Sequence, residues 1–279
     1  YMSLINQTRK ILEKPRERDK KKDTFWASES ETMLFEIYHR WKGTKPTNPI
    51  KAEAQVLMNA GKMMEEALVE QWIGAGEVQK SEDQIRIRMD RLGVPISGYI
   101  DALHVDGYPI EVKTFYGYWQ QKQLEQGKAR ESYLKQLAIY MDALDQDKGK
   151  LFYMERGNGK MFEFTLHRIN EKQFLCGDIG FNLHDTYQRW QDLYTNHVLP
   201  SQEPEPDYLY KIPASQIDWT KVSKSEVKKA RANQKVISGH PWAINYSGYK
   251  DLILQRQGVE PGYTVEELIE IKKYSEAFK

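Results

Sequence analysis

The sequence has very little cysteine and no long apolar run. Its 279 residues include one cysteine, Cys176, which excludes a disulfide within the chain and a metal site built from cysteines. We expect Cys176 to be a small core residue and the protein to be cytoplasmic, where free cysteines persist. No segment approaches the roughly 18 consecutive apolar residues of a membrane helix. The first residues also have no secretory-signal pattern, so we expect no membrane partner.

An excess of charge of either sign is also missing. Lys and Arg number 41 against 40 Asp and Glu, a net charge of +1, so binding to nucleic acid has to rest on local basic patches. Two segments offer such a patch, Arg9–Lys22 and Lys221–Lys235. A solvated helix face is an equally good interpretation of both. The sequence has no GxxxxGK[ST] phosphate loop, which argues against an ATP-driven motor.

The spacing of apolar residues predicts groups of helices alternating with groups of strands. Helical periodicity covers 26–41, 52–74, 121–144, 170–196, part of 221–235 and a last helix from 265. Strand alternation covers 84–90, 96–105, 110–115, 151–156 and 160–167, with a turn at Asn158–Gly159. Ser28 and Ser30 are candidate N-caps of the first helix, and residues 5–22 form a charged helix or arm. This order predicts a mixed α/β (α+β) protein with a central mixed sheet flanked by helices.

The segment GYIDALHVDGYPIEVKTF brings acidic and basic side chains together. Asp101 stands on one predicted strand, and Glu111 and Lys113 stand on the next. Residues two apart in a strand point to the same face, so Glu111 and Lys113 project together. An antiparallel pairing across the DGYP turn places Asp101 beside Glu111. Two carboxylates and one ammonium then share a small patch of a sheet.

This patch suits a divalent cation and a phosphate ester. Neighbouring carboxylates repel each other, and a cation such as Mg²⁺ or Mn²⁺ relieves that repulsion through hard oxygen ligands. The ion polarises a phosphodiester oxygen and lowers the pKa of a bound water. Lys113 can orient that water or stabilise the charge that develops on the phosphate. The residues therefore predict metal-dependent hydrolysis of a phosphodiester.

The arrangement resembles the PD-(D/E)XK nuclease superfamily. Asp101 stands at its first acidic position, and Glu111-Val112-Lys113 matches its E-x-K element. The resemblance implies that Asp101 and Glu111 bind the metal, that the main-chain carbonyl of Val112 adds a ligand, and that Lys113 is catalytic. It implies a nuclease core over residues 51–200, between a helical segment at 1–50 and a helical extension at 201–279 packed on the core.

Two helical motifs are similar to the RecB-type branch of that superfamily. In Gly61-Lys62-Met63-Met64-Glu65-Glu66 an acid stands four residues after the glycine, so Glu65 is the implied metal ligand and Glu66 the near alternative. Gln136 and Tyr140 match the branch's Q-x-x-x-Y motif and lie on one helical face. The resemblance implies that both help to shape the active site, although an exposed glutamine and a core tyrosine are the alternative.

Two flanking segments are similar to nucleases related to CRISPR adaptation proteins. They are WASESETMLFEIYHRWKGTKP, which starts at Trp26, and HPWAINYSGYKDLIL, which starts at His240. Relatives hold an iron–sulfur cluster with cysteines in these segments, whereas neither segment here contains a cysteine. We therefore expect no iron–sulfur cluster, with packing of Met33, Trp242 and Tyr249 in its place.

Further side chains near the motif have two interpretations each. His104 is out of phase with Asp101, so we expect it on the opposite side of its strand, away from the metal. The aromatic residues Tyr116, Tyr118 and Trp119 either pack against the next helix, which we favour slightly, or stack on unpaired bases. Cations that could contact phosphates, or simply be solvated, are Lys122, Lys128, Arg130 and Lys135.

The expected function is that of an exonuclease acting on DNA in recombination, repair or phage DNA metabolism, in a bacterial or phage-infected cell. A recombination or replication protein is a further candidate partner. A structure-dependent or nicking endonuclease is the first alternative. A DNA-binding module without catalysis is the second, although no acidic or lysine position of the motif is missing. An unrelated metal-dependent hydrolase with a chance E-x-K is the third.

Overall fold

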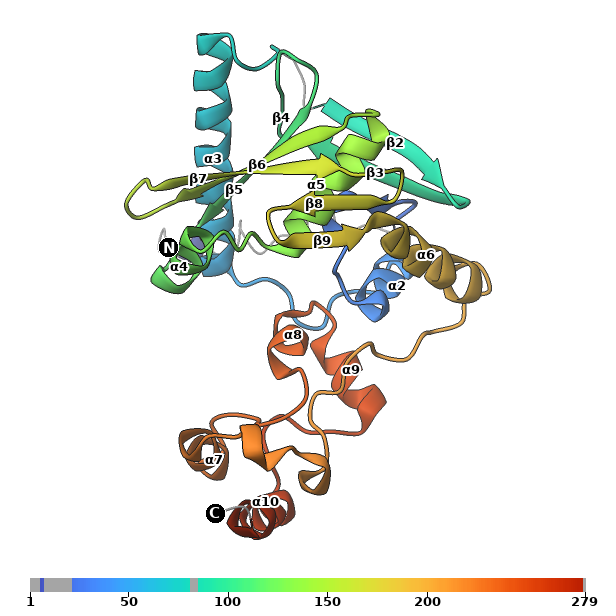
Figure 1. Cartoon of the computed structure of the whole chain (residues 1–279). Helices are drawn as coiled ribbons and strands as arrows, with labels where there is room; N and C mark the ends of the chain where they lie inside the picture. The colour runs from blue at the N-terminus through green and yellow to red at the C-terminus, as the bar shows by residue number, and fades with distance from the viewer. Residues whose placement is uncertain (1–5, 8–21, 81–84, 278–279) are drawn as a thin grey trace. The chain divides into compact units, whose positions relative to one another are not determined.

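The chain forms two compact units in the computed structural model (Figure 1). Unit 1 comprises Tyr1–Thr32 and Ile50–Gln202, and unit 2 comprises Met33–Pro49 and Glu203–Lys279. The structure describes residues 6–7, 22–80 and 85–277. Most of the predicted charged arm at 5–22 lies outside the described residues. Within the described part, no helix is both long and apolar enough to cross a membrane.

Unit 1 is built around a six-stranded mixed sheet. Its strand order is β4-β5-β6-β7-β8-β9, in which β5 and β6 run parallel and all other neighbours run antiparallel. The strands are β4 (Ala102–Leu103), β5 (Pro109–Phe115), β6 (Lys148–Glu155), β7 (Met161–Arg168), β8 (Gln173–Cys176) and β9 (Ile179–Asn182). The parallel pair needs a long connection, which α4 (Tyr118–Glu125) and α5 (Glu131–Ala143) supply.

A second, three-stranded sheet leads directly into the first. β2 (Ile85–Arg91) and β3 (Val94–Ile100) pair antiparallel, and β1 (Phe25–Trp26) pairs parallel with β3. Leu92 and Gly93 join β2 to β3 with positive φ angles of 54° and 73°, as a two-residue hairpin turn requires. Because β3 ends at Ile100 and β4 starts at Ala102, the chain passes between the two sheets at a single residue, Asp101.

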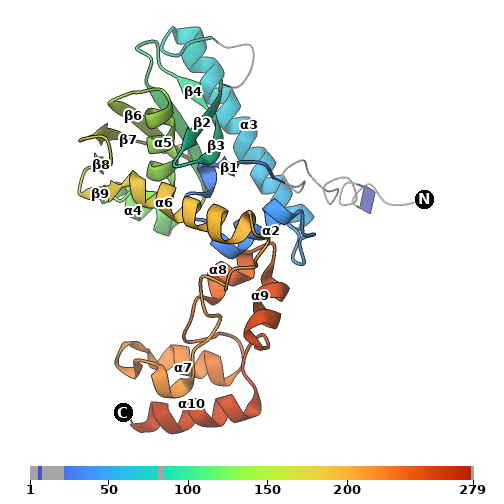
Figure 2. The same cartoon turned by 90° about the vertical axis from the view of Figure 1, so that its right-hand side faces the viewer.

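Helices α3 (Ala52–Ala75) and α5 pack on opposite faces of the six-stranded sheet, and α3 runs diagonally beside the strands in Figure 2. Ile110 and Val112 of β5 join one apolar cluster with Trp72 of α3. Side chains alternate along a strand, so Glu111 and Lys113 face the other way, toward α5. The predicted mixed α/β class with a central mixed sheet and flanking helices is confirmed.

The first predicted helix is wrong at its start. Residues 25–29 form β1 and a short 3₁₀ turn, and α2 (Leu34–Lys42) begins only at Leu34. Ser28 and Ser30 therefore do not cap it. The carboxylate of Asp207 accepts hydrogen bonds from the backbone N–H groups of Leu34 and Phe35, at 2.8 and 3.0 Å. A cap supplied from a distant part of the chain leaves no local sequence signal.

Two further helix predictions are wrong in part. Residues 173–182 form the β8–β9 hairpin, turned at Gly177 with a positive φ of 56°. The rest of the predicted helix is helical, as α6 (Leu183–Leu193) and a π-helical turn at Tyr194–Val198. Alternation of buried Phe174 and Cys176 with outward Leu175 was the missed strand signal. The helix expected over 121–144 is divided into α4 and α5 by a turn at Gly127. Cys176 is buried, as predicted.

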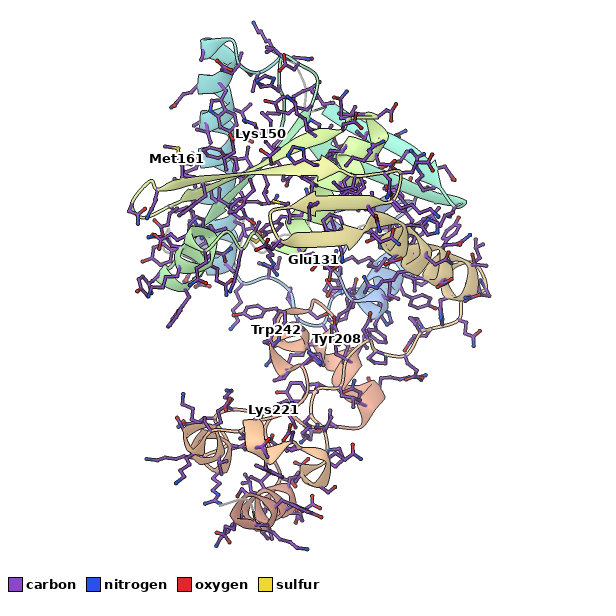
Figure 3. The ribbon with its side chains drawn as sticks, viewed as in Figure 1. Glu131, Lys150, Met161, Tyr208, Lys221 and Trp242 are labelled. Atoms are coloured by element: carbon purple, nitrogen blue, oxygen red, sulfur yellow. The ribbon has the colours of Figure 1, made fainter. Side chains whose placement is uncertain are left out.

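Unit 2 is helical and has its own apolar core. Its elements are α2, α7 (Lys224–Arg231), α8 (Pro241–Tyr246), α9 (Lys250–Gln257) and α10 (Val265–Ala277), with 3₁₀ turns at Ala214–Gln216 and Trp219–Lys221. Met33 and Tyr249 lie in one buried cluster, whereas Trp242 is 63% exposed, so its predicted packing with them was wrong. Figure 3 labels Trp242 on α8. That this packing stands in place of an iron–sulfur cluster stays a prediction. The predicted segments 1–50, 51–200 and 201–279 stay a prediction about folding units.

Candidate active site

The candidate site is centred on β5, whose alternation of side chains places Glu111 and Lys113 on one face. Glu111 is fully buried, with 0% exposure, while the Lys113 side chain is 22% exposed. The Lys113 ammonium forms an ion pair with Oε1 of Glu111. Oε2 of Glu111 receives no hydrogen bond from the described residues. A buried carboxylate with an unsatisfied oxygen is costly unless a cation or a proton compensates it.

Asp101 reaches the same strand from the junction of the two sheets. β4 pairs with β5 only at Pro109 and Ile110, so the outer edge of β5 is open from Glu111 onward. The backbone N–H of Val112 donates to Oδ2 of Asp101 across 2.8 Å at this edge. The N–H and C=O groups of one strand residue point to the same edge. The carbonyl of Val112 therefore also faces the side on which Asp101 lies.

Glu65 approaches that edge from α3. Its Oε1 accepts hydrogen bonds from the backbone N–H of Thr114, at 3.1 Å, and from the Thr114 hydroxyl, at 3.4 Å. A Cβ atom built on Gly61, one helical turn earlier, would lie 2.7 Å from the Thr114 hydroxyl oxygen. The glycine thus lets α3 come close enough to β5 for Glu65 to reach it. Glu66 is exposed and pairs with Lys62 at 3.6 Å, so it lies outside the site.

The three acids interact strongly with one another. Burial, followed by the charge of Asp101, raises the pKa of Glu111 to about 8, although Lys113 partly offsets this. Burial raises the pKa values of Asp101 and of Glu65 as well. Burial alone would lower the pKa of Lys113, but Glu111 and Asp101 outweigh it and raise that pKa. The three carboxyl groups therefore share the Lys113 ammonium, and Lys62 adds a smaller positive influence on Asp101.

The acids are close but are not arranged as a finished metal cage. Within the described part of the chain, no three His, Cys, Asp or Glu side chains stand in a geometry ready for a metal ion. The Lys113 ammonium is ion-paired with Glu111, and backbone N–H groups donate hydrogen bonds to Asp101 and Glu65. Ligation of one ion by all three acids requires Lys113 to leave Glu111, and the Asp101 and Glu65 side chains to turn from their present hydrogen-bond partners.

Gln136 and Tyr140 face the same site from α5. Both are buried, and Nε2 of Gln136 donates to the Tyr140 hydroxyl across 2.9 Å. Burial, and then the negative charge of Glu111, raises the pKa of Tyr140. A Cβ on Gly98 of β3 would lie 2.5 Å from the Tyr140 ring. Gly98 is thus a positioning residue that the sequence analysis missed, and its only signal was a glycine inside a strand pattern.

Tyr133 is a second residue that the sequence analysis missed. Lys113 Nζ lies 5.2 Å from the centre of the Tyr133 ring, and the Arg130 guanidinium lies 5.3 Å from it. Both distances suit cation–π contacts. Lys135, in contrast, is held by Glu31 at 2.5 Å and by Glu131 at 2.8 Å. Of the predicted phosphate-binding cations, Arg130 is the one that contacts the same Tyr133 ring as Lys113.

The remaining predicted residues lie around the site or away from it. His104 stacks on Tyr108 and pairs with Asp106 at 3.3 Å, so it is a satisfied histidine, as expected. Tyr116, Tyr118 and Trp119 are 75%, 60% and 77% exposed. The interpretation that these three aromatic residues pack against the next helix is therefore wrong.

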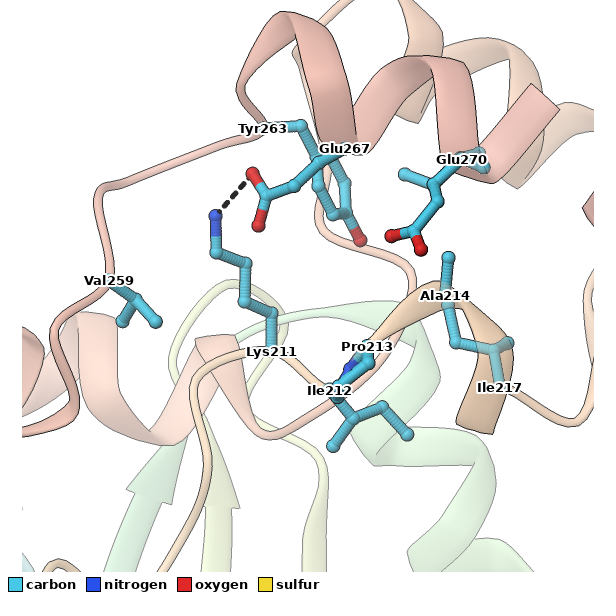
Figure 4. Close-up of a pocket in the computed structure, with 10 residues that line it drawn as sticks. Lys211, Ile212, Pro213, Ala214, Ile217, Val259, Tyr263, Glu267 and Glu270 are labelled. Atoms are coloured by element: carbon cyan, nitrogen blue, oxygen red, sulfur yellow. Dashed lines mark hydrogen bonds and ion pairs between the residues drawn. The ribbon is translucent and has the colours of Figure 1, made fainter. Parts of the chain in front are cut away.

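Unit 2 contains a separate small cavity of about 230 Å³ (Figure 4). Lys211 and Glu267 line it and pair with each other at 2.8 Å. Glu270 also lines the cavity, so its charged lining residues carry a net negative charge, which does not favour an anionic substrate. In the basic segment 221–235, Lys221 and Lys235 pair with Asp218 and Glu226. A role of this segment in DNA binding stays a prediction.

Comparison with known proteins gives only distant likenesses. No protein-family model and no curated protein matches the chain. The crystal structure of SSO0001 is 16% identical, with a TM-score of 0.44 over 70% of this chain and 84% of that one. The alkaline exonuclease LHK-Exo of Laribacter hongkongensis is 17% identical with a TM-score of 0.44, and its complex with dAMP is 14% identical with 0.47. Both cover 64% of this chain and 90% of that one. At these scores the likeness carries no conclusion about activity.

Proposed function

We propose that the chain is a metal-dependent nuclease that hydrolyses phosphodiester bonds of DNA. One observation carries the proposal: Glu111 is fully buried beside Asp101 and Glu65, with the Lys113 ammonium as its ion-pair partner. Such a cluster is unfavourable by itself, and a divalent cation among the oxygens removes the repulsion. The fold therefore maintains a cluster whose natural complement is a cation.

The donor set fits Mg²⁺ or Mn²⁺. Both prefer hard oxygen ligands, and the proposed ligands are the carboxylates of Glu65, Asp101 and Glu111 and the main-chain carbonyl of Val112. The open edge of β5 supports the last assignment, because the Val112 carbonyl faces the side from which Asp101 approaches. A bound ion would supply polarisation of a phosphodiester oxygen and a water of lowered pKa.

Residues of the chain itself carry the remaining steps. Lys113 keeps its proton, because Glu111 and Asp101 raise its pKa. On leaving Glu111, its ammonium can donate to a non-bridging phosphate oxygen and stabilise the negative charge that develops there. The Tyr140 oxygen accepts from Gln136, so its own proton is available for an acceptor in the site. We assign Lys113 as catalytic and Gln136 and Tyr140 as residues that shape the site.

We further propose that the enzyme degrades DNA from ends, as an exonuclease of recombination, repair or phage DNA metabolism. The Gln136–Tyr140 spacing, similar to RecB-type nucleases, supports this mode. The test is incubation of the purified chain with linear and with circular DNA in Mg²⁺ or Mn²⁺. Loss of linear DNA alone is expected. Cleavage of circles would instead identify a nicking or structure-dependent endonuclease. Binding without cleavage in either metal would identify an inert DNA-binding module.

Variants connect cleavage to the named residues. Glu111→Gln and Lys113→Ala are each expected to lower the cleavage rate by about a hundredfold or more, as loss of transition-state stabilisation does. Glu66→Gln is the matched control, because Glu66 adjoins Glu65 but is exposed, and its rate should be unchanged. Cleavage that survives Lys113→Ala would show an unrelated hydrolase whose E-x-K pattern is coincidental.

A further inference from the structure

Helix α4 buries few of its apolar side chains, which is unusual for a helix that follows a buried strand directly. Leu124 is buried, but Tyr118 and Trp119 at the start of the helix are exposed, as is Tyr116 just before it. Single exposed apolar residues need no explanation, but large aromatic residues grouped on one short segment indicate a binding surface. We call Tyr116, Tyr118 and Trp119 the aromatic segment.

Polar side chains supplement buried Leu124 in attaching α4, and they join the helix to the β6–β7 turn. Asn158 Nδ2 donates to Gln121 across 3.2 Å, and Lys160 pairs with Glu125 at 2.5 Å. The helix is thus held in place while Tyr118 and Trp119 stay in solvent. In an ordinary amphipathic helix the large apolar side chains are the buried ones.

The aromatic segment is also fixed where the chain leaves β5. Oε1 of the buried Glu155 accepts from the backbone N–H of Gly117 at 3.3 Å, and its Oε2 accepts from Gly157 and Asn158 at 2.5 and 2.7 Å. Gly117 has a φ of 116°, a conformation that suits glycine. The exposed rings therefore stand on a braced turn, so less conformational entropy is lost when they bind a ligand.

Both ends of α4 lead to the candidate site. At its beginning, Tyr116 is three residues after Lys113 on the same chain. At its end, the turn at 126–130 leads to Arg130, which shares the Tyr133 ring with Lys113. Positive charge accompanies the rings: Lys122 lies 4.8 Å from the centre of the Tyr118 ring, and Lys122, Lys128 and Arg130 are all exposed. The one acid of this stretch, Glu125, is already paired.

Exposed flat rings beside exposed cations fit one ligand chemistry, a strand with unpaired bases and a phosphate backbone. We propose that the aromatic segment is a stacking platform for the unpaired bases of a DNA strand held at the candidate site, with Lys122, Lys128 and Arg130 contacting its phosphates. The inference rests on the proposed nuclease function and adds a substrate class to it: DNA with a single-stranded end.

The test measures binding of a labelled oligothymidylate, a duplex of the same length and an abasic strand of the same length, with EDTA present to prevent cleavage. Stacking contributes about 1–3 kcal/mol per base, so Tyr118→Ala and Trp119→Ala should each weaken binding of the oligothymidylate about tenfold. Binding of the duplex should change little. Trp242→Ala and Tyr246→Ala are the matched controls, because these rings of unit 2 are 63% and 88% exposed.

The abasic strand separates stacking from phosphate binding. The wild type should bind it more weakly than Trp119→Ala binds the oligothymidylate, because an abasic strand loses the stacking contacts of all the rings at once. Equal wild-type affinity for abasic and normal strands, or unchanged affinity in both platform variants, would overturn the platform. If the wild type cleaves DNA while the variants bind single strands normally, the platform fails and the nuclease function stands. If the variants lose single-strand binding while the wild type cleaves nothing in Mg²⁺ or Mn²⁺, the nuclease function fails and the platform stands.

Discussion

At Glu111, stability and the proposed activity oppose each other. The side chain is fully buried, its pKa is raised to about 8, and two other acids lie near it. An uncharged amide of the same shape would relieve this cost, because the raised pKa means that the ionised carboxyl is less stable in the folded chain than in the unfolded one. A carboxylate at this position is therefore better explained by a bound cation than by the needs of the fold.

Above pH 4.5 the raised pKa of Glu111 costs folding stability that an amide does not lose, so Glu111→Gln should stabilise the metal-free protein by about 1–3 kcal/mol at pH 7. We expect its Tm in EDTA to rise by about 3 °C or more. Added Mg²⁺ should raise the Tm of the wild type, because a ligand that binds only the folded state stabilises it, but should raise that of the variant much less. Glu66→Gln should match the wild type in both conditions. A lower Tm of Glu111→Gln in EDTA would mean that the Glu111–Lys113 ion pair holds the fold together.

Among the elements, α3 contains two glycines, and one of them lets the helix approach the candidate site closely. Gly61 is buried where α3 meets Thr114, whereas a Cβ on Gly74 of the same helix would have no atom within 4 Å. Alanine in place of a helix-interior glycine ordinarily stabilises a protein by about 1 kcal/mol. Alanine at Gly74 therefore tests the helix propensity alone, whereas alanine at Gly61 also tests the close approach of α3 to β5.

Gly74→Ala should raise the free energy of unfolding by about 0.5–1 kcal/mol and leave cleavage unchanged. Gly61→Ala should bring no such gain, because the new Cβ displaces the Thr114 hydroxyl that holds Glu65. We also expect Gly61→Ala to weaken Mg²⁺ binding, measured by titration calorimetry. If the two variants gain stability equally and bind Mg²⁺ alike, the close approach of α3 does not position Glu65.

Helix α7 gives a prediction about pH. Glu226 and Ser223 form a capping box, and Lys235, followed by Ser223, lowers the pKa of Glu226 to about 2 from its usual 4.5. The unfolded chain therefore binds this proton more readily, so the ionised side chain stabilises unit 2 above pH 4.5 and loses that effect as the pH falls toward 2. Glu226→Gln can keep the capping box, which accepts Glu or Gln at this position, but it loses the charge that pairs with Lys235, so it should cost about 0.2–1 kcal/mol at pH 7. The difference in free energy of unfolding between variant and wild type, measured with urea, should vanish as the pH is lowered toward 2. A difference that does not depend on pH would show that ionisation of Glu226 is not its cause.

In the whole molecule, segments that are far apart in the sequence belong to the same folded unit. Unit 2 combines Met33–Pro49 with Glu203–Lys279, and the segment between them forms most of unit 1. Phe35 is fully buried in the cluster that also contains Tyr249 and Ile253. Segment 33–49 therefore has its core partners beyond residue 203. The proposed catalytic residues all belong to unit 1.

Deletion of 203–279 alone should leave Phe35 and its neighbours uncovered, and we expect a chain that aggregates and binds a hydrophobic dye. In a second variant, 203–279 is deleted and 33–49 is also replaced by a Gly/Ser linker. This variant lacks both halves of the unit 2 core, so no apolar segment is left without its packing partners. That variant should be soluble and should retain DNA cleavage. Equal solubility of the two variants would show that segment 33–49 does not depend on the C-terminal part.

Local sequence patterns predicted those helices and strands whose conformation depends on residues close together in the chain. Period-two alternation predicted β2, β5, β6 and β7, and period-3.6 spacing predicted α3 and most of α5. The pattern also predicted that Glu111 and Lys113 share a face, because alternation follows from strand geometry alone. The start of the helix predicted over 26–41 and the first part of the helix predicted over 170–196 were wrong, because spacing on short segments does not separate helices from strands.

The sequence by itself determined the mixed α/β class, the order of most elements and the pairing of Glu111 with Lys113, since each depends on residues close together in the chain. Only the tertiary structure decided that Glu65, not Glu66, faces β5, that Asp101 joins the two sheets, that Asp207 caps α2, and that the aromatic segment is exposed. Each of these depends on how closely distant segments approach. That distance is set by packing across the whole fold, as at Gly61 and Gly98, and it leaves no periodic signal in the chain.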